Sequence, residues 1–155
     1  MLPIHSLMGN ILSIYKDRHT FFNQLQSNNT TISYSFKRSI MSVTIYHNPR
    51  CSKSRQTLAL LEENDIQPEI VEYLKTPIDE STLDTLISKL GFDSAHQLVR
   101  NKETIYKELG LSKDSDEQTL RNAMLENPKL IERPIVVKGE KAALGRPPES
   151  VLDII

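Results

Sequence analysis

Residues 43–74 alternate between strand-like and helix-like hydrophobic patterns, and this alternation constrains the fold more than any other feature of the sequence. Residues 43–46 are β-branched or aromatic and run into a turn that contains a proline, which is typical of a short buried strand. Apolar residues then recur at helical spacing over 52–64, and the alternating segment 69–74 predicts a second strand. A strand, a helix and a strand in so short a stretch form a βαβ unit, whose two strands lie parallel with a right-handed crossover.

The middle of the chain is predicted to be helical. Ser81, with Asp84 three residues later, resembles a capping box and so predicts the start of a helix. Ser115 with Gln118 predicts a second helix start, and Pro128 ends that helix. Shorter helices are expected at residues 95–99 and 105–109.

Near the C-terminus the pattern returns to strands. Residues 135–137 and 142–144 flank a connection whose centre, Gly139 and Glu140, suits a two-residue hairpin of type II′. A final short helix is expected after Pro148. The order β-α-β, helices, β-β-α predicts an α/β protein with a mixed sheet, in the form of a thioredoxin-like fold that carries a helical insertion.

The first 40 residues differ in composition from the rest of the chain. They hold four of its 19 basic residues but only one of its 20 acidic residues, and they include a polar run at 23–31. No basic residue precedes an uninterrupted apolar stretch, as a secretory signal requires, and the two arginines give only a weak likeness to a transit peptide. We interpret residues 1–40 as a loosely ordered N-terminal extension and residues 41–155 as one domain, with Met41 as an alternative start.

Composition excludes several classes of protein. With 155 residues, of which 38% are hydrophobic and 25% charged, the chain is sized for a single packed domain. No stretch of about 18 apolar residues predicts a membrane span, and a net charge of −1 argues against nucleic-acid binding through a large basic surface. The single cysteine, Cys51, excludes an internal disulfide and a multi-cysteine zinc site, and a lone thiol is typical of the cytoplasm.

Cys51 lies just before the first predicted helix, where the backbone N–H groups and the helix dipole favour a thiolate. Arg50, Lys53 and Arg55 add positive charge nearby. A free thiol with a pKa near ~8.5 is only slightly ionised at pH 7, and lowering that pKa by about two units makes the thiolate the major form. The alternative is an inert buried cysteine, which the polar and charged neighbours disfavour. The sequence therefore predicts a reactive cysteine.

The residues around the cysteine disfavour several kinds of thiol chemistry. Ser54 stands where a Cys-x-x-Cys redox pair has its second cysteine, and Thr57 stands where a phosphatase loop has its arginine. A cysteine hydrolase needs a histidine partner, and His47 lies four residues before Cys51 across a turn, where we expect it to tune the thiol. The remaining histidines show no spacing typical of metal ligands, so no metal site is predicted.

Three arginines are candidates for an anion site. Arg133 and Arg146 each precede a proline in the C-terminal part of the chain, and Arg100 ends a short predicted helix. In a thioredoxin-like fold the residue before the third strand, here followed by Pro134 as a candidate cis-proline, lies beside the cysteine turn. Guanidinium groups stay charged and bind tetrahedral oxyanions through paired N–H groups. Taken singly each arginine is consistent with a solvated surface residue; together they predict an anion pocket next to the thiol of Cys51.

Four segments of the sequence resemble the glutaredoxin-coupled arsenate reductase family. They are His-Asn-Pro-Arg-Cys-Ser-Lys-Ser-Arg at 47–55, Tyr-Lys-Glu-Leu-Gly-Leu at 106–111, Glu-Arg-Pro-Ile-Val-Val at 132–137 and Gly-Arg-Pro-Pro-Glu at 145–149. The resemblance covers residues 41–155 and is strongest to a shorter branch that carries the His-Asn-Pro-Arg-Cys motif.

The resemblance implies roles for individual residues. Cys51 is expected to attack arsenate and His47 to support the thiolate. The residues expected to bind the oxyanion are Arg100, Arg133 and Arg146, and those expected to support the site are Asn48, Arg50, Ser54 and Pro134.

The resemblance also implies the partners of the reaction. No bound cofactor is expected; glutathione serves as co-substrate, and glutaredoxin resolves the disulfide that forms on Cys51. Two alternatives stay open, a thiol reductase that acts on another substrate and a non-catalytic adaptor like the regulators of this fold that bind RNA polymerase. Those regulators typically carry Cys-x-x-Cys, which is absent here. Neither nucleic acid nor a membrane is expected as a partner.

Overall fold

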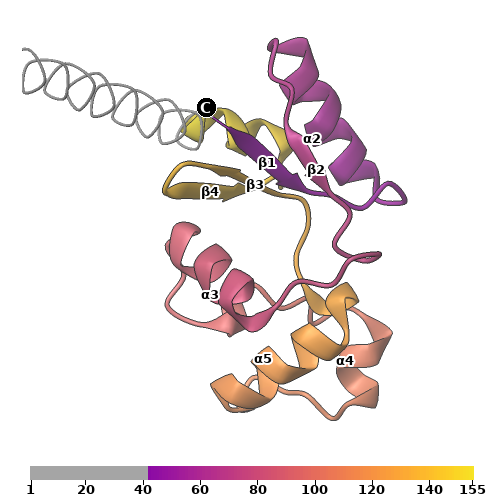
Figure 1. Ribbon diagram of the computed structural model, residues 1–155. Helices are drawn as coiled ribbons and strands as arrows, with labels where there is room; N and C mark the ends of the chain where they lie inside the picture. Colours follow the sequence, from indigo (N-terminus) through magenta and orange to yellow (C-terminus); the bar gives the residue numbers. More distant parts are fainter. Residues whose placement is uncertain (1–41) are drawn as a thin grey trace, which may run out of the picture. The chain divides into compact units, whose positions relative to one another are not determined.

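A mixed four-stranded sheet organises residues 42–155, the part of the chain that the computed structural model describes (Figure 1). The strands are β1 (Val43–Tyr46), β2 (Glu69–Val71), β3 (Ile135–Lys138) and β4 (Lys141–Leu144), in the order β2-β1-β3-β4. β1 runs parallel to β2 and antiparallel to β3, and β4 is antiparallel to β3. This confirms the predicted α/β, thioredoxin-like fold; the predicted extension, residues 1–40, lies outside the described residues.

Helices cover both faces of the sheet (Figure 1). On one face lie α2 (Ser52–Glu63) and the 3-10 helix η4 (Pro148–Ile154), which pack together. The insertion on the other face consists of α3 (Glu80–Lys89), η2 (Ala95–Gln97), α4 (Thr104–Glu108), α5 (Glu117–Glu126) and η3 (Pro128–Leu130). Within residues 42–155, none of these helices has the length and apolarity that crossing a bilayer requires.

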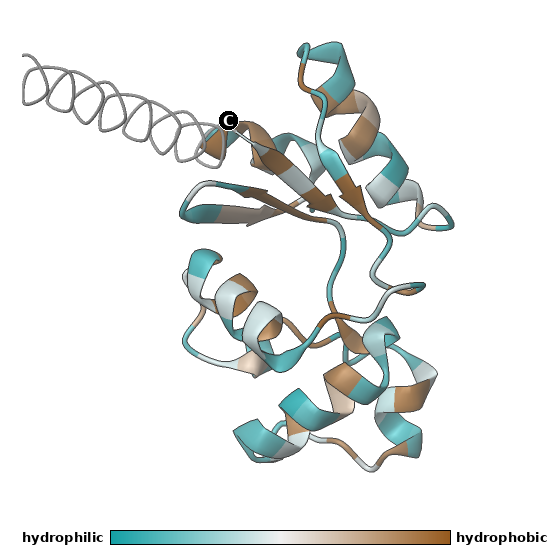
Figure 2. Ribbon diagram, viewed as in Figure 1, coloured by the Kyte–Doolittle hydropathy of each residue, from teal (hydrophilic) through white to brown (hydrophobic). Residues whose placement is uncertain are grey.

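Alternation along the strands divides the core into two parts. Ile45 and Val136 point to the side of α2, where they pack with Leu61 and Val151. Ile135, next to Val136 in β3, points to the opposite side and joins the larger core under the insertion. Figure 2 shows hydrophobic residues along the central strands, while the helices carry both hydrophobic and hydrophilic residues. This is the period-two pattern of a sheet that is covered on both faces.

The second predicted strand is shorter than expected. Residues 69–74 were predicted to be one strand, but β2 ends at Val71, and the Tyr73 N–H donates to the Val71 carbonyl in a turn at 3.0 Å. Tyr73 is fully buried in the larger core even though it lies outside the sheet. The apolar alternation beyond Val71 therefore reflects packing against the insertion, and not strand pairing.

Both predicted capping residues are wrong. Asp79, and not Ser81, caps α3 by accepting a hydrogen bond from the Thr82 N–H at 2.8 Å. In the same way Asp116, and not Ser115, caps α5. A carboxylate at a helix start accepts from the free N–H groups and also interacts favourably with the helix dipole, which a hydroxyl does not match.

The C-terminal hairpin has the predicted turn. Gly139 has a φ of +56°, which the first central position of a type II′ turn requires and which glycine adopts without strain. The final predicted helix is present as η4, but it has 3-10 geometry. The hairpin leads directly into the segment that carries Arg146.

Candidate active site

The loop between β1 and α2 holds Cys51 at the N-cap position of the helix, with an extended backbone (φ −93°, ψ 122°). The Cys51 N–H donates to the Asn48 carbonyl at 2.9 Å, and the Arg50 N–H donates to Asn48 Oδ1 at 3.0 Å. The Asn48 N–H donates in turn to Ser54 Oγ at 3.4 Å. Asn48 and Ser54, both buried, thus tie the loop to the first turn of α2 and fix the position of Cys51.

The environment of Cys51 lowers the pKa of its thiol. Burial acts in the opposite direction and raises that pKa, but the N–H groups of Ser54 and Lys53, the Ser54 hydroxyl and the charge of Arg133 outweigh it. All four stabilise the thiolate by hydrogen bonding or by opposite charge. Arg55, one of the flanking basic residues, instead donates to the Pro49 carbonyl.

His47 lies beneath the loop and is only 5% exposed. Its N–H donates to the Val71 carbonyl at 2.8 Å, which anchors the loop to the end of β2. Burial lowers the pKa of the imidazole, with the Arg55 charge adding to this effect and Glu72 opposing it. Among the described residues Nδ1 has no hydrogen-bond partner, and no hydrogen bond joins His47 to Cys51. Burial thus favours the neutral form of the imidazole, and the contact that His47 makes with the rest of the site is the backbone hydrogen bond that anchors the loop.

Three arginines and two glutamates form one ion-pair network beside the loop. Arg100 is its centre, with Nε 2.9 Å from Glu103 Oε1 and Nη1 3.1 Å from Glu132 Oε2. Glu103 Oε1 also lies 3.3 Å from Arg133 Nη2, and Glu132 Oε2 lies 3.3 Å from Arg146 Nε. The carboxylates hold all three guanidinium groups in place and offset part of their charge.

One of these arginines contacts the cysteine, and the charge of a second one acts on it. Arg146 Nη2 lies 3.9 Å from Cys51 Sγ, and Arg146 Nε donates to the Arg133 carbonyl at 2.8 Å. The Arg133 charge acts on the thiol, while Arg100 contacts the other two arginines only through the glutamates. The structure thus brings Cys51, Arg133 and Arg146 together, with Arg100 behind them.

The segments that carry Arg133 and Arg146 pack closely against each other and against α2. The Arg133–Pro134 and Arg146–Pro147 peptide bonds are both cis, and the Gly145 N–H donates to the Pro134 carbonyl at 2.9 Å. A Cβ at Gly145 would meet Thr57 of α2 and come within 2.7 Å of Pro134 Cγ. The absence of a side chain at Gly145 therefore lets the end of the hairpin pack onto α2, next to Cys51.

Three residues of this site were not predicted from the sequence, namely Glu103, Glu132 and Tyr73. Glu132 directly precedes Arg133, and Glu103 follows Arg100 by three residues, a spacing that allows an ion pair. Burial raises the pKa of Tyr73, and the charges of Arg133 and Arg100 act against this shift. Tyr73 was assigned to the sheet, so its place beside the arginines was not predicted.

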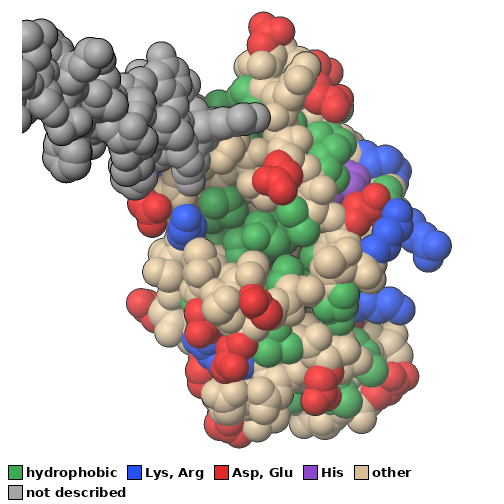
Figure 3. Space-filling model, in the orientation of Figure 1, with side chains coloured by type: hydrophobic (Ala, Val, Ile, Leu, Met, Phe, Trp, Pro, Cys, Tyr) green, Lys and Arg blue, Asp and Glu red, His purple; other side chains and the backbone are tan. Residues whose placement is uncertain are grey.

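The resulting site combines an activated thiol with guanidinium donors. Figure 3 shows basic side chains gathered on the right-hand margin of the molecule, over the loop between β1 and α2 and the turn after β2. Within the described part of the chain, no three metal-ligating side chains come together. The arrangement suits nucleophilic attack by sulfur on a small oxyanion.

Comparison with known proteins identifies the relatives of this chain. The sequence model of the ArsC family matches residues 46–154. The uncharacterized protein YfgD of Escherichia coli (strain K12) is 59% identical over 114 residues, which are 73% of this chain and 96% of YfgD. An arsenate reductase of Haemophilus influenzae is 51% identical over 116 residues, or 74% of this chain and 100% of that protein.

A solved structure shows the same relationship in three dimensions. The arsenate reductase from Vibrio cholerae superimposes with a TM-score of 0.72 at 51% identity, covering 74% of this chain and 98% of that one. The family match extends from the last residue of β1 into η4 and so includes Cys51 and all three arginines of the network. In fold and in sequence alike, this chain belongs to the ArsC family.

Proposed function

We propose that this protein reduces arsenate to arsenite, with Cys51 as the nucleophile and with glutathione and glutaredoxin supplying the electrons. The observation that carries the proposal is the position of Arg146 Nη2, 3.9 Å from Cys51 Sγ, with the charge of Arg133 acting on the same thiol. An activated thiolate beside fixed guanidinium donors suits attack on a tetrahedral oxyanion. The arsenate reductases that are about half identical to this chain support the same substrate.

In the first step the Cys51 thiolate attacks the arsenic atom of a bound arsenate. A sulfur–arsenic bond forms, and one arsenate oxygen takes up protons and leaves as water. Arg133 and Arg146 bind the remaining oxygens and stabilise the negative charge on them. Arg100 acts through Glu103 and Glu132, which keep the other two guanidinium groups in place.

The second step transfers the electrons. Because Cys51 is the only cysteine, the second sulfur of the disulfide must come from another molecule. The glutathione thiol attacks Cys51 Sγ, the sulfur–arsenic bond breaks, and its electron pair stays with arsenic, which leaves as arsenite. A glutaredoxin thiol then exchanges with the disulfide between Cys51 and glutathione, and the Cys51 thiol is restored.

The experiment that tests this function is arsenate-dependent oxidation of NADPH, coupled through glutathione, glutaredoxin and glutathione reductase. We expect turnover by the full chain and none by Cys51→Ser, which keeps a similar shape but replaces the nucleophilic sulfur. Omission of glutathione or of glutaredoxin must also stop sustained turnover. Arsenate reduction by Cys51→Ser at the wild-type rate would exclude the mechanism. Turnover of a glutathionylated peptide without any turnover of arsenate would indicate a different substrate.

A further inference from the structure

A pocket of about 690 Å³ lies beside the cysteine loop, and neither the family match nor the mechanism above assigns it a ligand. Its volume is within the range of small-molecule sites, roughly 300–1,000 Å³. One wall is formed by Asn48, Pro49 and Arg50, the three residues that directly precede Cys51. The opposite wall comes from the insertion, at α4 and at the end of α5.

The pocket adjoins the arginine network. Glu103, which holds Arg100 and Arg133, also lines the pocket. Lys129 lines it as well, and its carbonyl accepts a hydrogen bond from Arg133 Nη1 at 3.1 Å. A ligand in this pocket therefore contacts the loop residues that precede Cys51 and the two residues, Glu103 and Lys129, that bind the Arg133 guanidinium.

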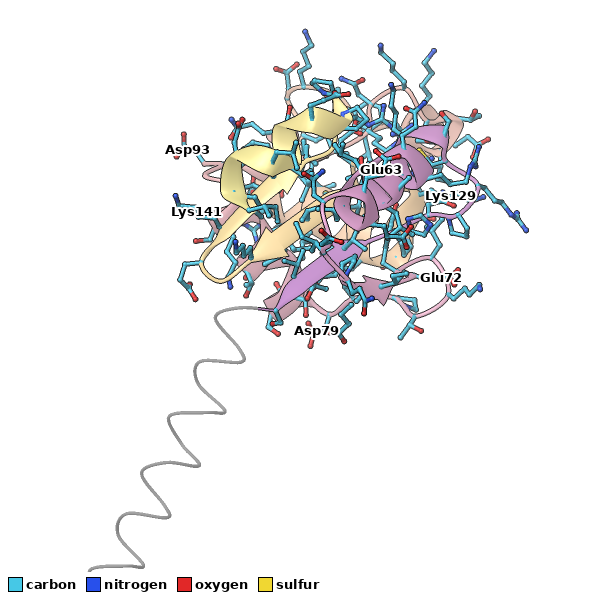
Figure 4. The ribbon with its side chains drawn as sticks, turned by 90° about the horizontal axis from the view of Figure 1, so that it is seen from above. Glu63, Glu72, Asp79, Asp93, Lys129 and Lys141 are labelled. Carbon is cyan, nitrogen blue, oxygen red and sulfur yellow. The ribbon has the colours of Figure 1, made fainter. Side chains whose placement is uncertain are left out.

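The pocket presents charges of both signs that have no partner in the protein. Within residues 42–155, Arg50, Lys129, Glu108 and Glu126 line the pocket, are exposed and take part in no ion pair. Figure 4 shows Lys129 and Glu72, another lining residue, on the same side of the molecule. These two cations and two anions, which have no ion-pair partner among residues 42–155, match a ligand that carries both carboxylate and ammonium groups.

We infer that this pocket binds the peptide thiol that acts as co-substrate, with its carboxylates on Arg50 and Lys129 and its ammonium on Glu108 and Glu126. The inference rests on the proposed function and adds a location for the second thiol. Glutathione has two carboxylates, one ammonium and one thiol, so its charged groups pair with these four side chains. Apolar lining residues, among them Leu74 and Ile105, contact its methylene groups.

The test is binding of S-methylglutathione, which keeps the three charged groups but has no thiol to react, to the full chain by NMR titration. We expect Lys129→Glu to weaken this binding by about tenfold or more, because a charge-assisted contact becomes a repulsion. The matched control is Lys141→Glu, since Lys141 is exposed and lies on the opposite side of the molecule in Figure 4. We expect this control to keep the wild-type Kd. Glu126→Lys provides a second pocket variant, and its Kd must also rise.

A kinetic measurement complements the titration. Lys129→Glu is expected to raise the KM for glutathione by about tenfold. Its KM for the neutral thiol 2-mercaptoethanol in place of glutathione is expected to stay unchanged, and its KM for arsenate is expected to change by much less than its KM for glutathione. The carbonyl of Lys129 that accepts from Arg133 is a backbone group, so the substitution leaves that contact in place.

Several results would overturn the inference. If Lys129→Glu and Glu126→Lys both keep the wild-type Kd, S-methylglutathione does not bind in the pocket. The same conclusion follows if the control Lys141→Glu weakens binding as much as Lys129→Glu does. A raised KM for glutaredoxin together with an unchanged KM for glutathione would assign the pocket to the protein partner. Failure of the proposed function gives a different pattern, in which the Kd values respond as expected but arsenate is not turned over.

Discussion

Arg133 is the arginine whose loss we expect to be most damaging. Its side chain is only 13% exposed, with Nη2 3.3 Å from Glu103 Oε1, and its charge lowers the pKa of the Cys51 thiol. A hydrogen bond to a charged group contributes about 1.5–3 kcal/mol, and each 1.4 kcal/mol or so is a factor of about ten in rate. Arg133→Ala should therefore reduce kcat/KM for arsenate by about tenfold to a hundredfold.

The coupled arsenate assay measures this loss, and Arg121→Ala is the matched control. Arg121 is also a partly buried, ion-paired arginine, but its partners are Asp84 and Glu117 in α3 and α5. Arg133→Lys should recover little activity, because lysine keeps the charge and loses the planar fork. Arg133→Ala should also raise the pH midpoint of Cys51 alkylation by iodoacetamide.

The reasoning would be refuted by an Arg133→Ala enzyme with the kcat/KM of the wild type. A loss equal to that of Arg121→Ala would also refute it, since this would be a general effect of removing a buried arginine. Full recovery by lysine would show that charge alone is needed and that the paired N–H geometry is not.

Three other perturbations test separate parts of the account. Because its environment lowers the pKa of Cys51, the pH midpoint of alkylation by iodoacetamide should lie below that of a free cysteine, and alkylation should slow as the pH falls through that midpoint. Ser54→Ala should shift the midpoint upward, and a wild-type midpoint near or above ~8.5 would contradict the account. Glu132→Gln removes a negative charge between Arg100 and Arg146 but keeps an acceptor oxygen. Because less of the arginine charge is then offset, the KM for arsenate should fall about two- to fivefold. An unchanged KM would show that the carboxylate charge does not affect binding of the anion. Deletion of residues 1–40 should leave arsenate turnover and the melting temperature intact, and a large fall in melting temperature would refute our interpretation of that segment.

Local sequence patterns predicted the elements of the fold whose signals are periodic. β1 and α2 were predicted closely, because a β-branched run and a helical repeat each report directly on burial. The Gly139 turn was predicted because only glycine accepts its backbone conformation easily. The strand at 69–74 was predicted too long, since the buried side chain of Tyr73 continues the alternation after the chain has left the sheet.

The candidate site was predictable where its residues stand next to a motif. The thiol of Cys51 and its helix start follow from adjacent residues in the chain. The ion pair between Glu132 and Arg100 joins side chains that are 32 residues apart, so it depends on how the insertion folds back onto the sheet. An acidic residue in a loop has the same sequence signal whether it is solvated or paired, which is why both glutamates were missed.

The central claim concerns the two thiols that form the disulfide: Cys51 is the one that the protein supplies, and glutathione supplies the other. The most direct measurement is mass spectrometry of the protein after incubation with arsenate and glutathione, with glutaredoxin withheld. A control without arsenate shows whether adduct formation needs the oxyanion. The account predicts a single glutathione adduct on Cys51 that accumulates only when arsenate and glutathione are both present. Unmodified Cys51 under these conditions, while arsenate reduction continues, would contradict it.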